Sequence, residues 1–322
     1  MMQNIHAQTA DIHVLTVAKL APLLANQLTV YTLHDRLHET NAADFEKIAP
    51  QVRGIVGSGE SKVSAELIAK LPALEMISIM GVGYDGVDVT AAKARGIQVT
   101  HTPNVLNDDV ADLAIGLMLC ASRQLPAADR FVRAGQWTAS AMPLARKMSG
   151  ARLGLVGMGR IGQAIAHRAK AFGMSIAYTS RTAKPNVAYL HFANAKALAA
   201  ESDFLVVITP GGAATRKMIN AEVLAALGPK GILVNVARGS VVDEEALIEA
   251  LEKGVIAGAG LDVFESEPHV PERLRALPHV VLVPHIGSAT QQTRQAMADL
   301  AANNLAAHFS GKPLITPVPE CQ

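Results

Sequence analysis

Three short stretches carry side chains that together could act on a small carboxylic acid. They read N-V-A-R-G-S (235–240), L-D-V-F-E-S-E-P (261–268) and V-P-H-I-G-S-A-T (283–290). Each follows an apolar run typical of a buried strand, so its polar residues are expected at the carboxyl edge of a sheet. Arg238 would supply an anion clamp, Glu267 a carboxylate and His285 an imidazole. Taken singly, each residue could instead be structural: a surface charge, a loop residue before proline, or a turn residue.

A glycine-rich turn between a predicted strand and a predicted helix indicates where a nucleotide would bind. Residues 151–162 read A-R-L-G-L-V-G-M-G-R-I-G, and an Ala-rich helix follows. The first glycine of G-x-G-x-x-G permits the tight turn, the second lets backbone approach a pyrophosphate, and the third lets helix and strand pack closely. The helix N-terminus adds free N–H groups and the positive end of the helix dipole. With these flanks, dinucleotide binding is favoured over an ordinary turn. The predicted contacts are Gly157, Gly159, Arg160, Ile161 and Gly162.

Composition limits the class of protein and its partners. The chain has 322 residues, of which 50% are hydrophobic and 18% charged, so about two domains with large cores are expected. The net charge is +1 and no dense Lys/Arg run occurs, which argues against nucleic acid or a membrane surface as the main partner. Cys120 and Cys321 lie far apart and indicate reduced thiols rather than a disulfide. The N-terminus (Met1–Asp11) lacks a signal pattern, so we expect a cytoplasmic protein, and nothing points to a metal site.

Predicted strands alternate with predicted helices twice along the chain. The expected strands are 12–17, 28–33, 52–56, 76–80 and 97–100 in the first part, and 152–156, 174–179, 204–208, 232–236, 257–261 and 280–283 in the second. This rhythm predicts an α/β fold with two Rossmann-like or flavodoxin-like domains and parallel sheets. A glycine-rich loop (81–88) follows the fourth strand, where such sheets bind ligands, although it could also be a plain turn.

Two long helices define the expected domain boundaries. Residues 107–122 read as one linking helix, and residues 288–310 as another that opens with Ser288 as its cap. The second could return the chain to the first domain. We therefore predict a discontinuous substrate domain, 1–102 plus 288–322, and a dinucleotide-binding domain, 103–287. A polar, flexible passage containing Trp137 is expected between the linking helix and the glycine turn.

Taken in order, these motifs resemble the D-isomer-specific 2-hydroxyacid dehydrogenase family. The resemblance covers nearly the whole chain: the 81–88 loop, the N-D-D-V-A-D-L helix, the glycine turn, N-V-A-R-G-S-x-V-D, L-D-V-F-E-x-E-P and P-H-I-G-S-A-T. It implies two α/β domains with a cleft between them, and usually a homodimer.

The resemblance also implies a role for each candidate residue. Arg238 would hold the carboxylate and carbonyl of a 2-keto acid, and His285 would protonate the carbonyl oxygen as hydride arrives. Glu267 would hydrogen-bond the imidazole and favour its charged form. The remaining implied contacts are Val82 and Gly83 for the substrate, through backbone N–H groups, and Pro210, Val236, Ala237, Asp262 and Gly287 for the cofactor, with Asp262 on the nicotinamide carboxamide. Trp137 could also face the substrate, although packing in a core or at a subunit interface is at least as good an interpretation of a single tryptophan.

The second strand of the nucleotide-binding domain bears on cofactor choice. NAD-binding folds normally carry an Asp or Glu about 20 residues beyond the glycine turn, to bind the ribose 2′-OH. No acidic residue occurs from Gln163 to Ala200. The strand instead ends in Ser180, Arg181 and Thr182, and a guanidinium with hydroxyls can bind a 2′-phosphate. We therefore expect NADP(H) to be preferred and NAD(H) possible, unless Arg181 is only a solvated loop charge.

The 178–181 edge and the 105–118 helix are most similar to the glyoxylate/hydroxypyruvate reductase branch of the family. The predicted function is thus an NADPH-preferring 2-keto acid reductase with a small acid substrate. Two alternatives stay open. One is a D-2-hydroxyacid dehydrogenase for phosphoglycerate or a bulkier 2-keto acid. The other is a nucleotide-sensing binding protein resembling the transcriptional corepressors that share this fold.

Overall fold

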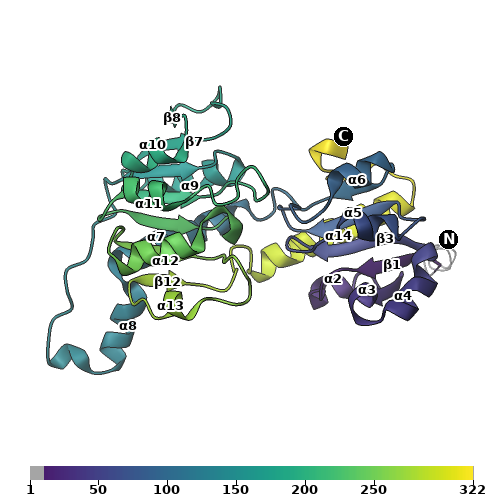
Figure 1. Ribbon diagram of the computed structural model, residues 1–322, viewed down its shortest axis with the longest axis horizontal. Helices are drawn as coiled ribbons and strands as arrows, with labels where there is room; N and C mark the ends of the chain where they lie inside the picture. Colours follow the sequence, from purple (N-terminus) through teal and green to yellow (C-terminus); the bar gives the residue numbers. More distant parts are fainter. Residues whose placement is uncertain (1–10, 322) are drawn as a thin grey trace. The chain divides into compact units, whose positions relative to one another are not determined.

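The chain divides into two compact units, each with its own sheet (Figure 1). A computed structural model describes residues 11–321, so the expectation about a targeting signal falls almost wholly outside the described residues. Unit 1 comprises residues 1–106 and 290–322, and unit 2 comprises residues 107–289. Within the described residues, no helix is both long and apolar enough to cross a membrane. Cys120 and Cys321 are free thiols.

Unit 1 contains a five-stranded parallel sheet in the order β2-β1-β3-β4-β5. Its strands are β1 His13–Thr16, β2 Thr32–Asp35, β3 Val52–Ser58, β4 Met76–Met80 and β5 Gln98–Thr100. Its helices are α2 Pro22–Ala25, α3 Leu37–Thr40, α4 Ala42–Ile48, α5 Ala65–Ala69, α6 Val89–Ala94 and α14 Gln291–Phe309. Every residue of β4 is buried, which explains its continuous apolar sequence.

Two predicted boundaries in unit 1 were wrong for local reasons. The second strand begins at Thr32 rather than Leu28, because Leu28 and Tyr31 lie in turns closed by backbone hydrogen bonds. Helix α14 begins after Thr290, whose hydroxyl accepts from the N–H of Thr293, so Ser288 is not its cap. The N–H of Ala289 instead bonds to the carbonyl of Ile286, and the chain is still in a turn there.

Helix α14 returns the chain to the sheet of unit 1. It packs against β4, and the Ser78 hydroxyl donates to the carbonyl of Ala301 at 3.0 Å. After α14 the chain runs beside β5, where the N–H of Val318 donates to the carbonyl of Val99. The C-terminal segment is therefore part of unit 1.

Unit 2 contains a seven-stranded parallel sheet in the order β12-β11-β10-β9-β6-β7-β8. Its strands are β6 Arg152–Val156, β7 Ser175–Thr179, β8 Leu190–Phe192, β9 Phe204–Val207, β10 Ile232–Asn235, β11 Gly258–Leu261 and β12 Val280–Leu282. The strand order reverses between β6 and β9, and open α/β sheets bind ligands beyond the carboxyl ends of the strands at such a point. The sequence predicted six strands and missed β8, a three-residue edge strand.

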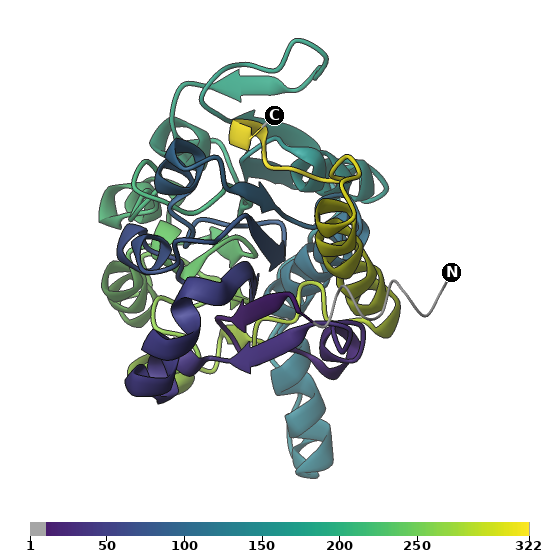
Figure 2. The same ribbon diagram turned by 90° about the vertical axis from the view of Figure 1, so that its right-hand side faces the viewer.

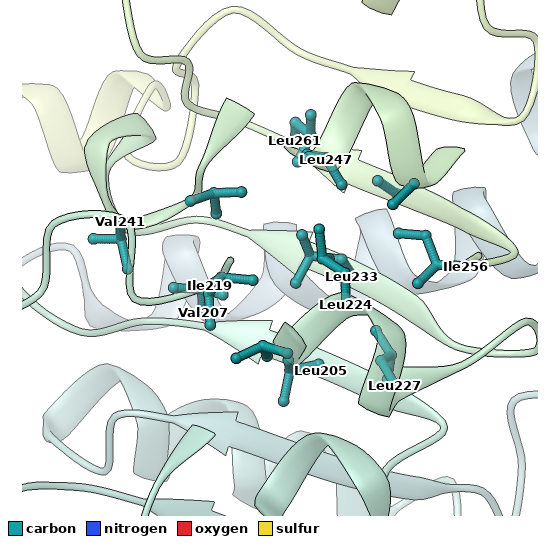
Figure 3. Packing of buried hydrophobic residues seen from close by; sticks show 14 of the residues in the cluster. Leu205, Val207, Ile219, Leu224, Leu227, Leu233, Val241, Leu247, Ile256 and Leu261 are labelled. Carbon is teal, nitrogen blue, oxygen red and sulfur yellow. The ribbon is translucent and has the colours of Figure 1, made fainter. Parts of the chain in front are cut away.

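Helices cover both faces of this sheet (Figure 1). They are α7 Asn107–Arg123, α8 Leu125–Arg133, α9 Arg160–Lys170, α10 Ala195–Ala200, α11 Ala221–Leu227, α12 Glu244–Glu252 and α13 Glu272–Arg275. Apolar side chains from β9, β10 and β11 meet those of α11 and α12 in a buried cluster, seen around Leu205, Leu233 and Leu247 in Figure 3. This core fixes the strand ends from which the candidate site residues emerge.

The sequence predicted a polar, flexible passage between α7 and β6, but part of this passage is helical. It contains α8 and a short 3₁₀ helix, Gln136–Thr138, and α8 projects away from the rest of unit 2 (Figures 1 and 2). No residue of α8 is buried, so the helix could not be recognised from a core-facing stripe. Asp129 and Arg133 form an ion pair one turn apart on its surface.

Candidate active site

The three glycines of the turn after β6 occupy three different environments. Gly157 has φ of +113°, and a Cβ there would lie 2.7 Å from the carbonyl oxygen of Ile208. A Cβ on Gly162 would lie 2.5 Å from the carbonyl oxygen of Gly157, so this glycine allows α9 to pack against the turn. Gly159 precedes α9 and has no atom within 4 Å of its Cβ position. The open position at a helix N-terminus fits a phosphate-bearing cofactor.

Arg238, Glu267 and His285 follow three adjacent strands, β10, β11 and β12, at the carboxyl edge of the unit 2 sheet. The loops after β10 and β11 touch. A Cβ on Gly239 would lie only 1.9 Å from the backbone carbonyl of Phe264. Arg238 is half-buried, and its Nη1 donates to the carbonyl of Ala237 at 2.8 Å. The guanidinium is therefore anchored next to the loop that carries Glu267.

Glu267 and His285 form a direct pair. Nδ1 of His285 lies 2.7 Å from Oε2 of Glu267, and the other carboxylate oxygen of Glu267 accepts from the N–H of Phe264 at 2.8 Å. Both side chains are partly buried. Because the carboxylate accepts from Nδ1, it fixes the orientation of the ring, and Nε2 is the nitrogen on the opposite side.

Asp262 builds the turn that presents His285. Its two carboxylate oxygens accept from the N–H groups of Ile286, at 2.6 Å, and Gly287, at 2.9 Å. The carboxylate is 2% exposed, and burial raises its pKa although the two N–H donors act in the opposite direction. His285 itself has φ of +51°, a left-handed conformation that is uncommon outside glycine. The position of the imidazole thus depends on this buried anchor.

The glycine-rich loop of unit 1 presents backbone N–H groups. Within the described residues, the N–H groups of Val82 and Gly83 donate to no protein acceptor. The carbonyl of Val82 accepts from Nδ1 of His101 at 2.9 Å, which holds the peptide in place. Tyr84 donates to Glu320 at 3.1 Å, and burial, with this carboxylate, raises the pKa of Tyr84 to about 12.

Comparison with known proteins identifies the family. The family model for the D-isomer specific 2-hydroxyacid dehydrogenase, NAD binding domain, matches residues 115–287. The chain is 52% identical to a hydroxyphenylpyruvate reductase of Plectranthus scutellarioides, over 84% of this chain and 86% of that protein. It is also 52% identical to a glyoxylate/hydroxypyruvate reductase of Arabidopsis thaliana, over 83% of this chain and 85% of that protein.

The chain belongs to the D-isomer specific 2-hydroxyacid dehydrogenase family. It is therefore an NAD(P)-dependent oxidoreductase. A solved structure of an NADPH-dependent glyoxylate/hydroxypyruvate reductase from Sinorhizobium meliloti, in complex with NADP and malonate, superposes with a TM-score of 0.90 at 46% identity. That match covers 97% of this chain and 98% of the other.

In this dehydrogenase, the strand end where NAD-binding folds carry an acidic residue is basic and hydroxylated. Ser180 follows β7, and its hydroxyl donates to the carbonyl of Thr182 at 2.7 Å. Arg181 and Thr182 are exposed, and no carboxylate lies in this segment of the sequence. These groups fit an additional phosphate better than a ribose hydroxyl.

The other predicted cofactor residues lie around the same sheet edge. Arg160 and Ile161 form the first turn of α9, and Pro210 lies in the loop after β9. Val236 and Ala237 are buried immediately after β10. Trp137 lies apart from these residues in the sequence, in the 3₁₀ helix after α8, and is 71% exposed.

Two contributions of this edge were not predicted from the sequence. Gly239 allows the loops after β10 and β11 to approach each other, and Asp262 fastens the turn at His285 through both oxygens. The glycine immediately after Arg238 was the available signal for the first. For the second, the sequence shows only an aspartate at a strand end, and the partner N–H groups lie 24 and 25 residues further along the chain.

Proposed function

We propose that this dehydrogenase is an NADPH-preferring reductase that converts glyoxylate and hydroxypyruvate to the corresponding 2-hydroxy acids. The observation that supports the chemistry is the 2.7 Å pair of Glu267 and His285 beside the loop of Arg238. The preference for NADPH is supported by the exposed Arg181 at the end of β7. The NADP-bound Sinorhizobium meliloti reductase, with its 46% identity, supports both parts.

The proposed mechanism assigns one task to each side chain. Arg238 binds the carboxylate and the keto oxygen through its planar fork, which orients the carbonyl. His285, protonated and held by Glu267, donates a proton from Nε2 to the carbonyl oxygen as negative charge develops there. When bound, the reduced nicotinamide supplies the hydride that the keto carbon accepts. In the reverse direction neutral His285 takes the hydroxyl proton.

Backbone groups complete the assignment. We assign the N–H groups of Val82 and Gly83 to the substrate carboxylate, since they have no protein acceptor within the described residues. The pyrophosphate is assigned to the turn at Gly159 and the first turn of α9. Asp262 and Gly287 are assigned to the nicotinamide end of the cofactor. The observed contact of Asp262 is with the backbone, since its carboxylate accepts from the N–H of Gly287. The cleft between two domains stays a prediction of the family resemblance.

We further propose that the protein is a cytoplasmic homodimer joined through the segment around α8. This segment exposes Leu125, Val132, Trp137 and Leu144, which is an unusual concentration of large apolar side chains. Light scattering after size-exclusion chromatography tests the proposal. A mass of two chains is expected, and a mass of one chain contradicts it.

The main rival is a reductase of bulkier 2-keto acids, because the hydroxyphenylpyruvate reductase is as similar as the glyoxylate/hydroxypyruvate reductase, at 52% identity. A single steady-state assay separates the candidates. NADPH oxidation is measured with glyoxylate, hydroxypyruvate, pyruvate, 4-hydroxyphenylpyruvate and phosphohydroxypyruvate. We expect the highest kcat/KM with glyoxylate or hydroxypyruvate. A clear advantage of 4-hydroxyphenylpyruvate would transfer the assignment to the rival, and no turnover with any acid would favour a nucleotide-sensing protein.

A further inference from the structure

The segment between β7 and β8, here called the 180–189 loop, carries the basic groups assigned to the cofactor. Most of its residues are exposed, and it extends from the edge of the unit 2 sheet (Figures 1 and 2). An exposed loop of this length would normally sample many conformations, and ordering it would reduce the affinity for a ligand. In this loop, however, three contacts fasten the backbone.

The first contact is made by a buried hydroxyl. Tyr178, in β7, is 1% exposed, and its hydroxyl accepts from the N–H of Lys184 at 2.7 Å. The N–H of Val187 then bonds to the carbonyl of Lys184 at 3.1 Å and closes the next turn. The middle of the loop is thus tied to a side chain that belongs to the sheet core.

The second contact comes from β8. His191 pairs with Tyr178 across the two strands, and their rings lie 5.0 Å apart. Nε2 of His191 lies 3.1 Å from the carbonyl oxygen of Ser180, so the ring donates to the first residue of the loop. The Tyr178–His191 pair therefore holds the loop at Ser180 and at Lys184, on either side of Arg181.

The third contact fastens the far end. Nζ of Lys170, at the end of α9, lies 5.3 Å from the ring centre of Tyr189. A cation over an aromatic ring contributes about 0.5–1 kcal/mol at exposed sites. This contact ties the loop to the helix that begins at the glycine turn.

We propose that Tyr178 and His191 are positioning residues for recognition of the 2′-phosphate of NADPH. They act through the backbone of the 180–189 loop, which they hold so that Arg181 and the hydroxyls of Ser180 and Thr182 are presented together. This inference rests on the proposed function, because it requires that Arg181 binds the 2′-phosphate. Neither residue was singled out as a contact from the sequence, because the contacts of Tyr178 with Lys184 and of His191 with Ser180 depend on the folded loop.

The test is binding of two probes that differ only by the phosphate, 2′-phospho-ADP-ribose and ADP-ribose, measured by calorimetry. Tyr178→Phe keeps the buried ring and removes only the hydroxyl. Loss of one neutral hydrogen bond should weaken 2′-phospho-ADP-ribose about fivefold and leave ADP-ribose within about twofold. Tyr189→Phe is the matched control, because its hydroxyl has no hydrogen bond within the described residues and the same deletion should change neither affinity.

Arg181→Ala separates this inference from the function on which it rests. It should weaken binding of 2′-phospho-ADP-ribose by about tenfold or more. Adding Tyr178→Phe to it should cause a smaller further loss than Tyr178→Phe causes alone, because only the hydroxyls of Ser180 and Thr182 then remain to be positioned. Suppose that Arg181→Ala weakens binding of 2′-phospho-ADP-ribose only, but Tyr178→Phe weakens binding of both probes equally or of neither. The positioning role is then wrong while the cofactor assignment stands. If Arg181→Ala leaves both affinities unchanged, the assigned phosphate site is wrong and the positioning role is wrong with it.

Discussion

Nδ1 of His285 lies 2.7 Å from Oε2 of Glu267, although the two residues are 18 positions apart in the sequence. The pair is possible because β11 and β12 are neighbours in the sheet and both end at the same edge. Glu267 is fixed in turn by the N–H of Phe264, and His285 by the turn that Asp262 anchors. The proton donor of the proposed reaction is therefore held from both strands.

Replacing Glu267 with Gln tests the charge of this pair. The amide can still accept from Nδ1, but it carries no negative charge to stabilise the imidazole when that ring bears the proton to be donated. We expect kcat for keto acid reduction to fall about 10- to 100-fold. Steady-state rates of wild type and variant with NADPH and glyoxylate check this, and an unchanged kcat would contradict the role of Glu267.

Replacing Asp262 with Asn tests the anchor. Asn offers one acceptor oxygen, so either Ile286 or Gly287 loses its buried partner and faces an NH₂ group. The expected loss of unfolding free energy is about 1–3 kcal/mol, measured by urea denaturation, with a lower kcat because the His285 turn loosens. An unchanged denaturation midpoint would show that the two hydrogen bonds do not hold the turn.

Gly239→Ala tests the contact of the loops after β10 and β11. A Cβ at this position would overlap the backbone carbonyl of Phe264, so one of the two loops must move. We expect a lower melting temperature and a loss of kcat/KM of about 10-fold or more, since Arg238 is the adjacent residue. Gly116→Ala, in α7 with nothing within 4 Å of its Cβ, is the matched control. It should gain up to about 1 kcal/mol of stability and keep full activity.

Two glycines of the turn after β6 should respond differently to alanine. Gly159→Ala has space for a methyl group and an ordinary φ of −81°, so the variant should fold normally but bind NADPH weakly. Gly162→Ala would place Cβ 2.5 Å from a backbone oxygen and should lower the melting temperature. Thermal unfolding and fluorescence titration with NADPH measure the two effects. Normal NADPH affinity in Gly159→Ala would show that the turn does not bind the cofactor.

The sequence predicted the elements that are buried and regular. Residues 76–80 and 152–156 match β4 and β6 because continuous apolar runs bounded by turns have few alternatives. Helix α8 was missed because its apolar residues face no core, and β8 because three edge residues carry too little pattern. The prediction of Ser288 as a helix cap was wrong for a different reason. The turn at 286–289 is set by Asp262, which is distant in the sequence.

For the site, sequence order was sufficient to bring Arg238, Glu267 and His285 to one edge, because strands of a parallel sheet end on the same side. The contacts that depend on three-dimensional approach were not predictable. These include Gly239 against Phe264 and the hydroxyl of Tyr178 against Lys184. Their roles in catalysis and cofactor choice remain predictions that the variants above test.

The most direct test of the proposed chemistry is turnover by the His285→Asn variant. Asparagine tolerates the left-handed backbone at this position, where φ is +51°, so the turn should persist. Single-turnover and steady-state rates with NADPH and glyoxylate are measured beside the Kd for NADPH. We predict that kcat falls by about 10²–10⁴-fold while the Kd stays within about twofold of wild type. A variant that folds, binds NADPH and turns over at nearly the wild-type rate would contradict the assignment of His285 as the proton donor.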